Sequence, residues 1–285
     1  MGGTKALTDK RFPTEKLAWN LLGLLVACLF LFPLLWLFLS SLKNDIEIFR
    51  NPPTFFPEAV TLNGYIDQLS GKYSILVSSK NSFIIALSAM AISFVLGVPA
   101  AYGLSRYKLP CKKLIMMLFL ITQMIPASLA LTPMFLTFTK LNLLNTYAAP
   151  IMSVSTITIP FSVLVLRPMF MGCPREIEEA ARIDGCGTPG VFLKMVLPMI
   201  KPGLITVCCF GFVHGWNDLI FSYTFNSDSS LLPMTSAIYN LMSDYGVKWN
   251  YIMAYGCLLV LPVVLIFVLA QKYVVGGLVA GAVKG

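Results

Sequence analysis

The sequence predicts an all-α integral membrane protein with six transmembrane helices. Of its 285 residues, 57% are hydrophobic and only 12% are charged, and the mean hydropathy is +0.78. Soluble domains carry about 25% charged residues, so this composition points to a lipid environment. The apolar residues also gather into charge-poor stretches of about 20 residues or more, the length that a helix needs to cross the hydrocarbon core.

Six such stretches organise the chain. The predicted spans are Leu17–Leu42, Asn81–Ser105, Leu114–Thr139, Leu141–Leu166, Pro202–Tyr223 and Trp249–Gln271. The last five form a core at 81–271, and the remaining segments are a tail at 1–16, a loop at 43–80, a loop at 172–200 and a tail at 272–285. Several spans contain prolines, Pro126 among them, which predicts kinked helices whose freed carbonyl groups find other partners.

Basic residues are unevenly distributed between the segments that join the spans. Most of the 21 lysines and arginines lie in the two tails and in the loops 106–113 and 167–201. Segments that stay in the cytoplasm are enriched in Lys and Arg. We therefore expect both termini and the loop 172–200 to face the cytoplasm, and the loop 43–80 to face outward.

The loop 172–200 predicts two short helices. Pro174 suits a first helical position, and the glutamates after it favour the positive end of the helix dipole. Gly185 supplies a stop for the first helix. Thr188 is suited to cap the second helix, and Pro198 interrupts it.

The first of these helices has an apolar face as well as a charged one. Ile177, Ala180 and Ala181 share one side of it, and Glu178 and Arg182 are spaced for an ion pair along the helix. Helices that lie on lipid usually display bulky apolar residues and an excess of lysine, and this helix has neither. The small alanines favour docking on a close-fitting protein partner.

The same loop resembles a known family. Its pattern consists of Glu179, Ala180, Ala181, Gly185, Leu197 and Pro198. This pattern and its spacing are similar to the EAA loop of permease subunits in ATP-binding-cassette (ABC) importers. The glycine-rich residues 276–285 resemble the tail of the smaller permease in maltose-type carbohydrate importers. There the tail reaches towards the ATPase, a role that suits an end unable to hold a rigid helix.

The resemblance implies a set of partners. Glu179, Ala180, Ala181 and Gly185 would form a coupling helix on an ABC ATPase dimer, with Glu179 paired to a basic group there; the alternative is that Glu179 pairs with Arg175 on its own helix. A second, related permease would complete a heterodimer, and an extracytoplasmic sugar-binding protein would deliver the substrate. The location implied is the bacterial cytoplasmic (inner) membrane.

One acidic residue, Asp218, lies inside a predicted span. A charge in the membrane is costly, which makes it a functional candidate. Trp216, Asn217 and Asp218 offer a stacking face, an amide and a carboxylate, groups that suit a sugar, and similar runs occur in carbohydrate permeases. The alternatives are that Asp218 caps a helix end or pairs with Lys248. The single histidine, His214, favours a packing role over a proton relay and cannot form a metal site alone.

These observations predict the permease subunit of an ABC importer for a sugar or oligosaccharide. The chain has no G-x-x-x-x-G-K-[ST] loop to hold ATP phosphates, so a separate subunit must hydrolyse ATP. It is expected to have no enzymatic activity of its own, no cofactor or metal, and no nucleic-acid partner. The alternatives are an ABC permease for an amino acid or phosphate, and a secondary transporter driven by an ion gradient, which usually shows several intramembrane ionisable groups.

Overall fold

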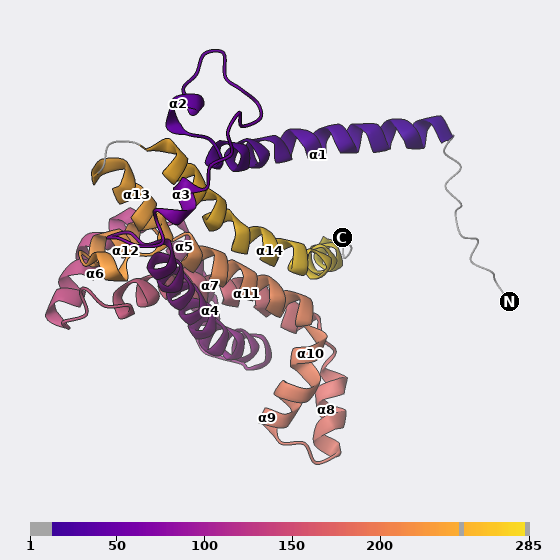
Figure 1. Ribbon diagram of the computed structural model, residues 1–285. Helices are drawn as coiled ribbons and strands as arrows, with labels where there is room; N and C mark the ends of the chain where they lie inside the picture. Colours follow the sequence, from indigo (N-terminus) through magenta and orange to yellow (C-terminus); the bar gives the residue numbers. More distant parts are fainter. Residues whose placement is uncertain (1–12, 245–247, 283–285) are drawn as a thin grey trace.

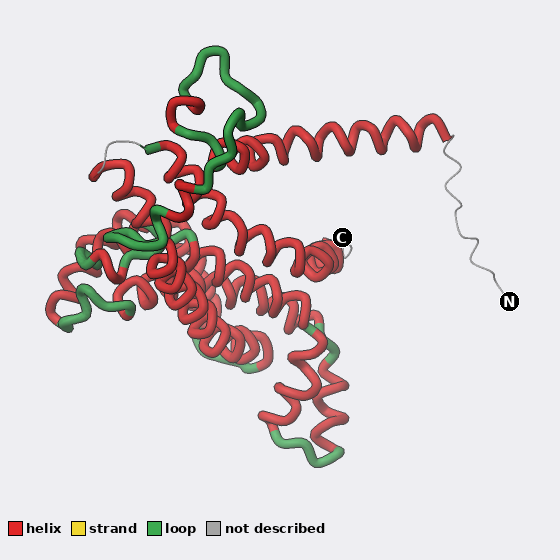
Figure 2. Tube along the Cα trace, viewed as in Figure 1, coloured by secondary structure: helices red, strands yellow, loops and turns green. Residues whose placement is uncertain are grey.

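The computed structural model describes residues 13–244 and 248–282, and every regular element in this part of the chain is helical (Figures 1 and 2). Four helices are long and apolar enough to cross a membrane. They are α1 (Pro13–Ser41), α4 (Ile75–Arg106), α7 (Ala148–Gly172) and α14 (Trp249–Ala282). Two bent helix pairs raise the number to six if each pair is one span. The predicted all-α membrane class is confirmed.

The first bent pair consists of α5 (Lys112–Met124) and α6 (Ala127–Lys140). The second consists of α11 (Lys201–Trp216) and the short helices at Thr188–Met199, and the remaining short helices lie in the connections. The short helices are α2 (Asp45–Ile48), α3 (Asn63–Ile66), α8 (Arg175–Ile183), α9 (Thr188–Gly190), a π-helix at Val191–Val196, α10 (Leu197–Met199), α12 (Ile220–Phe225), a 3-10 turn at Ser229–Leu231 and α13 (Met234–Asp244).

The centre of the molecule is the packing of α4 against α7 and α11. Two glycines permit the close approach of these helices. A Cβ at Gly97 would lie 2.8 Å from the Cβ of Ser162 on α7, and a Cβ at Gly215 would lie 2.6 Å from the Cα of Ala86. Small residues at helix contacts are typical of membrane bundles, where packing and hydrogen bonds replace the hydrophobic drive. The hydroxyls of Ser93 and Thr158 add such a hydrogen bond between α4 and α7.

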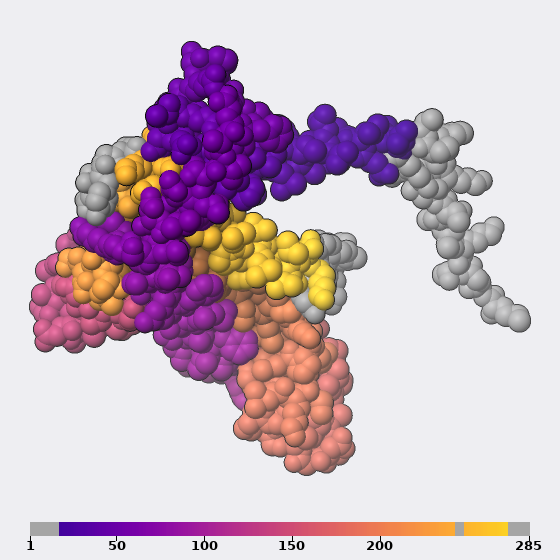
Figure 3. All heavy atoms as spheres, in the orientation of Figure 1, coloured from indigo at the N-terminus to yellow at the C-terminus, as the bar shows by residue number. Residues whose placement is uncertain are grey.

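At one end, α1 contacts α14, and the rest of it projects away from the bundle as a long arm (Figures 1 and 3). Most of its apolar side chains are exposed, and only Leu39, Ser40 and Ser41 at its end are buried. The loop that carries α2 lies at one end of the molecule, and α8, α9 and α10 project at the opposite end (Figure 1).

The third predicted span, Leu114–Thr139, differs from the structure most. It forms two helices, α5 and α6, with an angle of 101° between them. Ile125 at the break is extended, with ψ of 122°. The residue before a proline is disfavoured in the helical region, and Pro126 has no N–H group to continue the ladder. The proline therefore breaks the helix sharply where the sequence predicts a kink.

The second predicted span lies within a longer helix, and the fourth is displaced. The helix α4 begins at Ile75 and so includes Lys80, and α7 begins only at Ala148 instead of Leu141. The segment before α7 turns because Asn142 and Asn145 adopt the left-handed region, with φ of 54° and 55°. Asparagine tolerates this conformation better than most residues.

The fifth and sixth predicted spans differ at their ends. The fifth, Pro202–Tyr223, breaks after Trp216, and α12 is a separate helix. The sixth continues as α14 to Ala282, so the predicted tail at 272–285 is helical as far as it is described, against the expectation that its glycines prevent a helix. Glycine weakens a helix by only about 1 kcal/mol relative to alanine, so it does not by itself end one. The residues 1–12 and 283–285 of the predicted tails lie outside the described part.

Candidate functional site

The helix α8 and the π-helix form a hairpin that packs on the ends of α4 and α7 (Figure 1). Gly185 ends α8 with a φ of +84°, which confirms the predicted stop. Its N–H donates to the carbonyl of Arg182 over 3.0 Å, and the N–H of Cys186 donates to the carbonyl of Ala181 over 2.9 Å. This pair of bonds is the Schellman arrangement, in which a glycine in the left-handed region satisfies the last carbonyls of a helix.

The inward face of α8 differs from the predicted one. Glu178 and Ala181 are buried, whereas Ile177 and Ala180 are exposed. Ala181 packs in a hydrophobic cluster with residues of α4, α7, the π-helix and α11. The exposed face therefore presents Glu179 and Ala180 from the predicted set and leaves Ala181 inside the protein.

The ion pairs of α8 also differ from the prediction. Glu178 does not pair with Arg182, because Arg106 Nε donates to its Oε1 over 2.6 Å and Tyr102 Oη donates to its Oε2 over 2.8 Å. Sequence reasoning missed this contact, since Arg106 lies far away in the sequence on α4. Within the described structure, Glu179 and Arg175 form no ion pair.

The second candidate group is divided by the break after α11. Trp216 is 1% exposed, and its Nε1 donates to the carbonyl of Leu259 on α14 over 2.9 Å. Its ring stacks on Phe212, with centroids 5.6 Å apart. Trp216 therefore fastens α11 to α14, and it presents no free face for stacking on a ligand.

Asp218 caps α12. Its carboxylate accepts hydrogen bonds from the backbone N–H of Phe221 (3.2 Å), the N–H of Ser222 (2.9 Å) and the hydroxyl of Ser222 (2.6 Å). This geometry matches the alternative that Asp218 caps a helix end. The alternative pair with Lys248 is absent, because the Nζ of Lys248 lies 4.9 Å from the ring centroid of Tyr251.

A cavity of about 440 Å³ lies beside the break. Asn217 is exposed and lines it, together with Asp218 and His214. His214 is half-buried, and its ring lies 4.2 Å from the ring of Phe210, a packing contact. The cavity combines an amide, an imidazole and an apolar wall from α6 and α7, which suits a small polar ligand that also has apolar faces.

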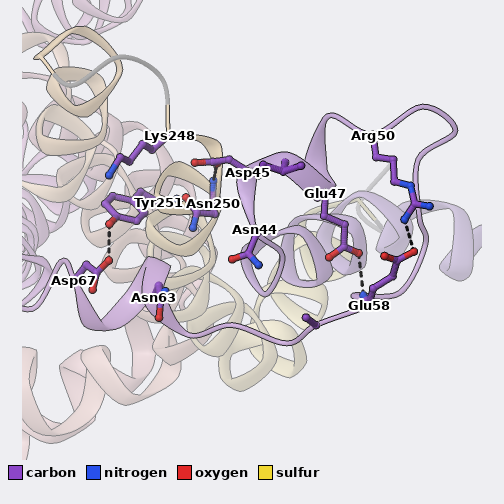
Figure 4. A pocket seen from close by; sticks show the side chains of 12 residues that line it. Asn44, Asp45, Glu47, Arg50, Glu58, Asn63, Asp67, Lys248, Asn250 and Tyr251 are labelled. Atoms are coloured by element: carbon purple, nitrogen blue, oxygen red, sulfur yellow. Dashed lines mark hydrogen bonds and ion pairs between the residues drawn. The ribbon is translucent and has the colours of Figure 1, made fainter.

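A larger cavity, about 930 Å³, lies between the loop 43–80 and the start of α14 (Figure 4). Asp45 Oδ1 accepts from the N–H of Asn250 over 3.0 Å, and the Tyr251 hydroxyl donates to Asp67 Oδ2 over 2.5 Å. These bonds hold the loop on α14. Sequence reasoning treated the segment as a plain loop, and no spacing rule predicts contacts between two segments this far apart in the chain.

The rim of this cavity carries acidic groups. Glu47 accepts from the Thr54 hydroxyl over 2.7 Å, and this hydrogen bond lowers the pKa of the Glu47 carboxyl, which therefore stays charged. Glu58 pairs with Arg50 and donates its N–H to Glu47 over 2.9 Å (Figure 4). Contacts of Glu47 and Glu58 within the loop therefore help to hold its conformation. No group of three or more His, Cys, Asp or Glu that could hold a metal occurs among the described residues.

The family described as "Binding-protein-dependent transport system inner membrane component" matches residues 93–278. The sulfoquinovosyl glycerol transport system permease protein SmoH of Agrobacterium fabrum is 34% identical, over 90% of this chain and 89% of its own length. The arabinooligosaccharides transport system permease protein AraQ of Halalkalibacterium halodurans is 30% identical, over 97% of this chain and 100% of its own length.

A solved structure is similar in fold. The bacterial ABC transporter involved in the import of the acidic polysaccharide alginate contains a chain that superimposes with a TM-score of 0.78. The alignment covers 96% of this chain and all of that one, at 19% sequence identity. The arrangement of helices described above therefore occurs in that transporter as well.

Proposed function

This chain belongs to the family of binding-protein-dependent transport system inner membrane components, and we propose that it carries a sugar or oligosaccharide across the bacterial inner membrane as one subunit of an ATP-driven importer. The observation that carries the substrate class is the similarity, over nine-tenths of the chain or more, to permeases named for sulfoquinovosyl glycerol and arabinooligosaccharides. The alternative, an amino-acid or phosphate permease, would share the loop 172–200, so that loop does not carry the substrate class.

The loop 172–200 is the proposed docking element for the ATPase dimer. Its hairpin projects from the end of the bundle, so a partner can enclose it (Figure 3). Glu179 and Ala180 are exposed on α8 and are proposed to contact the ATPase, with Glu179 facing a basic group. Ala181 and Gly185 shape the helix from within, the first by packing and the second by its turn.

Three further partners complete the proposed importer. A second, related permease and membrane lipid would cover the exposed apolar surface, which includes most of the large apolar side chains of α1. An extracytoplasmic sugar-binding protein would dock on the outer end, where the cavity between the loop 43–80 and α14 presents acidic and basic side chains (Figure 4). Polar rims of this kind give an interface its specificity and association rate.

The proposed substrate pathway runs past the break after α11. Asn217 and His214 line the 440 Å³ cavity there and can donate or accept hydrogen bonds to sugar hydroxyls. Asp218 shapes the wall by capping α12, and Trp216 holds α11 in place against α14. The pathway role is therefore assigned to Asn217 directly, and to Asp218 and Trp216 through the position of their neighbours.

The proposed orientation predicts the side from which single cysteines react. In a cysteine-free background, a cysteine at Ser70 should react with a membrane-impermeant maleimide added outside intact cells. A cysteine at Gly187 should react only after the membrane is opened, because both positions are exposed and the charge distribution places them on opposite sides. Reaction of Gly187→Cys in intact cells would show that the orientation is the opposite of the proposed one.

Reconstituted uptake tests the proposed function. Proteoliposomes with the chain, its sister permease and its ATPase should accumulate radiolabelled arabinooligosaccharide or sulfoquinovosyl glycerol. Uptake should require enclosed ATP and the binding protein outside, and a protonophore should leave the initial rate unchanged. Accumulation that follows an ion gradient without ATP would instead identify a secondary transporter. Phosphate and amino acids, tested with the same preparation, should not compete.

A further inference from the structure

A buried ion pair joins α4 to α8. Arg106 Nε donates to Glu178 Oε1 over 2.6 Å, and Arg106 Nη2 donates to the carbonyl of Cys173 over 2.9 Å. Both charged side chains are 8% exposed. Because desolvation offsets most of the attraction in a buried pair, an apolar pair of similar size would hold these helices about as well. Stability alone therefore does not account for charges at this contact.

A second residue of α4 holds the same carboxylate. Tyr102 lies one helical turn before Arg106, and its hydroxyl donates to Glu178 Oε2 over 2.8 Å. The ring of Tyr102 contacts Phe170 of α7 and Phe192 of the π-helix, with centroids 5.5 and 4.8 Å apart. Both oxygens of Glu178 are thus bound to one face of α4 in a fixed geometry, which a helix presents at this spacing.

The other end of α4 is anchored as firmly. The side-chain amide of Asn81 donates to the carbonyls of Ser230 and Leu232, over 2.8 and 3.0 Å, and its oxygen accepts from the hydroxyl of Tyr147 over 2.6 Å. The helix α4 runs without interruption for 32 residues, which is about 48 Å at 1.5 Å per residue. It connects α8 to the turn at 229–234, close in sequence to α12.

We propose that Arg106, Tyr102 and Glu178 form a joint that passes movement of α8 to α4, and along α4 to the turn at 229–234. This inference rests on the proposed docking of α8 on the ATPase. The chain itself offers another route, through α10 to α11, but an 84° bend separates these elements. The joint, by contrast, connects α8 to α4 by direct hydrogen bonds. Its three members are positioning residues, because Glu178 is turned away from the exposed face of α8 and none of them lines the cavity at Asn217.

The first test replaces Glu178 in the importer purified with its native partner subunits. Glu178→Gln keeps the size of the side chain and one acceptor oxygen but removes the charge. The variant should retain its ATPase subunits and its ATP hydrolysis, while the radiolabelled sugar moved per ATP falls about tenfold, within the usual range of coupling between sites. A structural role alone would lower assembly, hydrolysis and transport together and leave the sugar moved per ATP unchanged.

A milder variant keeps the inference testable if Glu178→Gln fails to assemble. Tyr102→Phe removes one hydrogen bond and leaves the ring contacts in place. It should lower the sugar moved per ATP by about threefold, the effect of one hydrogen bond. If the residues act as one joint, the double variant should be no worse than Glu178→Gln alone, since effects of coupled residues do not add.

The outcomes separate the joint from the docking of α8. Wild-type sugar moved per ATP in Tyr102→Phe, or in assembled Glu178→Gln, overturns the joint. Glu179→Lys lies on the exposed face of the same helix and serves as the reference. If Glu179→Lys uncouples the importer while the two joint variants are normal, docking stands and the joint is wrong. If Glu179→Lys is also normal, α8 is not the docking element and both proposals fail.

Discussion

Reversing the charge of Glu179 is expected to abolish most sugar uptake without reducing the amount of protein in the membrane. Glu179 is exposed on α8, and within the described structure it forms no ion pair with Arg175, so its replacement removes nothing from the fold. At the proposed ATPase surface, Glu179→Lys places a cation beside a basic group. Like charges in an interface cost about 2 kcal/mol or more, which is about thirtyfold in affinity. Uptake of radiolabelled sugar at matched abundance measures the loss.

The matched control is Glu176→Lys, which makes the same change of charge at the start of α8. Glu176 is also exposed and lies one turn earlier, beside a small cavity at Arg175. This variant should keep at least half of wild-type uptake and bind the ATPase normally. Equal losses from both variants would show a general effect of charge at this end of the molecule, and an unaffected Glu179→Lys would remove Glu179 from the docking surface.

Local rules predicted the backbone of this loop well. Gly185 has the left-handed conformation that the predicted helix stop requires, because glycine has no Cβ and adopts a positive φ without steric cost. The helix α8 begins at Arg175, directly after Pro174. The resemblance of the loop to the EAA pattern agrees with the family that residues 93–278 match. These features depend on residues close together in the sequence, so they can be predicted from the sequence alone.

Side-chain partners could not be predicted in the same way. The sequence offers Glu178 an obvious neighbour in Arg182 on its own helix, but the bundle brings Arg106 closer and buries the pair. Trp216 stands beside Asn217 in the sequence, yet it turns towards α14 while Asn217 stays exposed. Adjacent residues on a helix point in different directions, and only the packing of the other helices decides which direction is buried.

The spans themselves were predictable as apolar stretches but not at their ends. Hydropathy continues without change across Pro126, where the chain turns by 101°. Apolar residues also resume directly after Asn217 and Asp218, so the predicted span runs past the point where α11 ends. Hydropathy indicates whether a segment prefers lipid or water. These breaks depend instead on the backbone geometry before proline and on the capping of helix ends.

Replacing Asp218 with alanine is expected to destabilise the region around α12 and to reduce transport with it. The carboxylate accepts three hydrogen bonds, from the N–H groups of Phe221 and Ser222 and from the Ser222 hydroxyl, and these donors are buried. Alanine leaves them without an acceptor, at about 1 to 3 kcal/mol for the unsatisfied groups. The loss should appear as a lower melting temperature in detergent and as weaker sugar uptake at matched abundance.

Two companion variants decide between a cap and a charge that serves transport. Asp218→Asn keeps one acceptor oxygen, so a capping role predicts a smaller loss than with alanine, whereas a role for the charge predicts equal losses. Lys248→Ala should leave the melting temperature nearly unchanged, because the Lys248 ammonium group lies over the ring of Tyr251 and does not pair with Asp218. A loss of melting temperature in Lys248→Ala as large as that of Asp218→Ala would instead support an ion pair between the two residues. A normal melting temperature with lost uptake in Asp218→Ala would show that the carboxylate acts on the substrate, since a missing cap must weaken the fold that it closes.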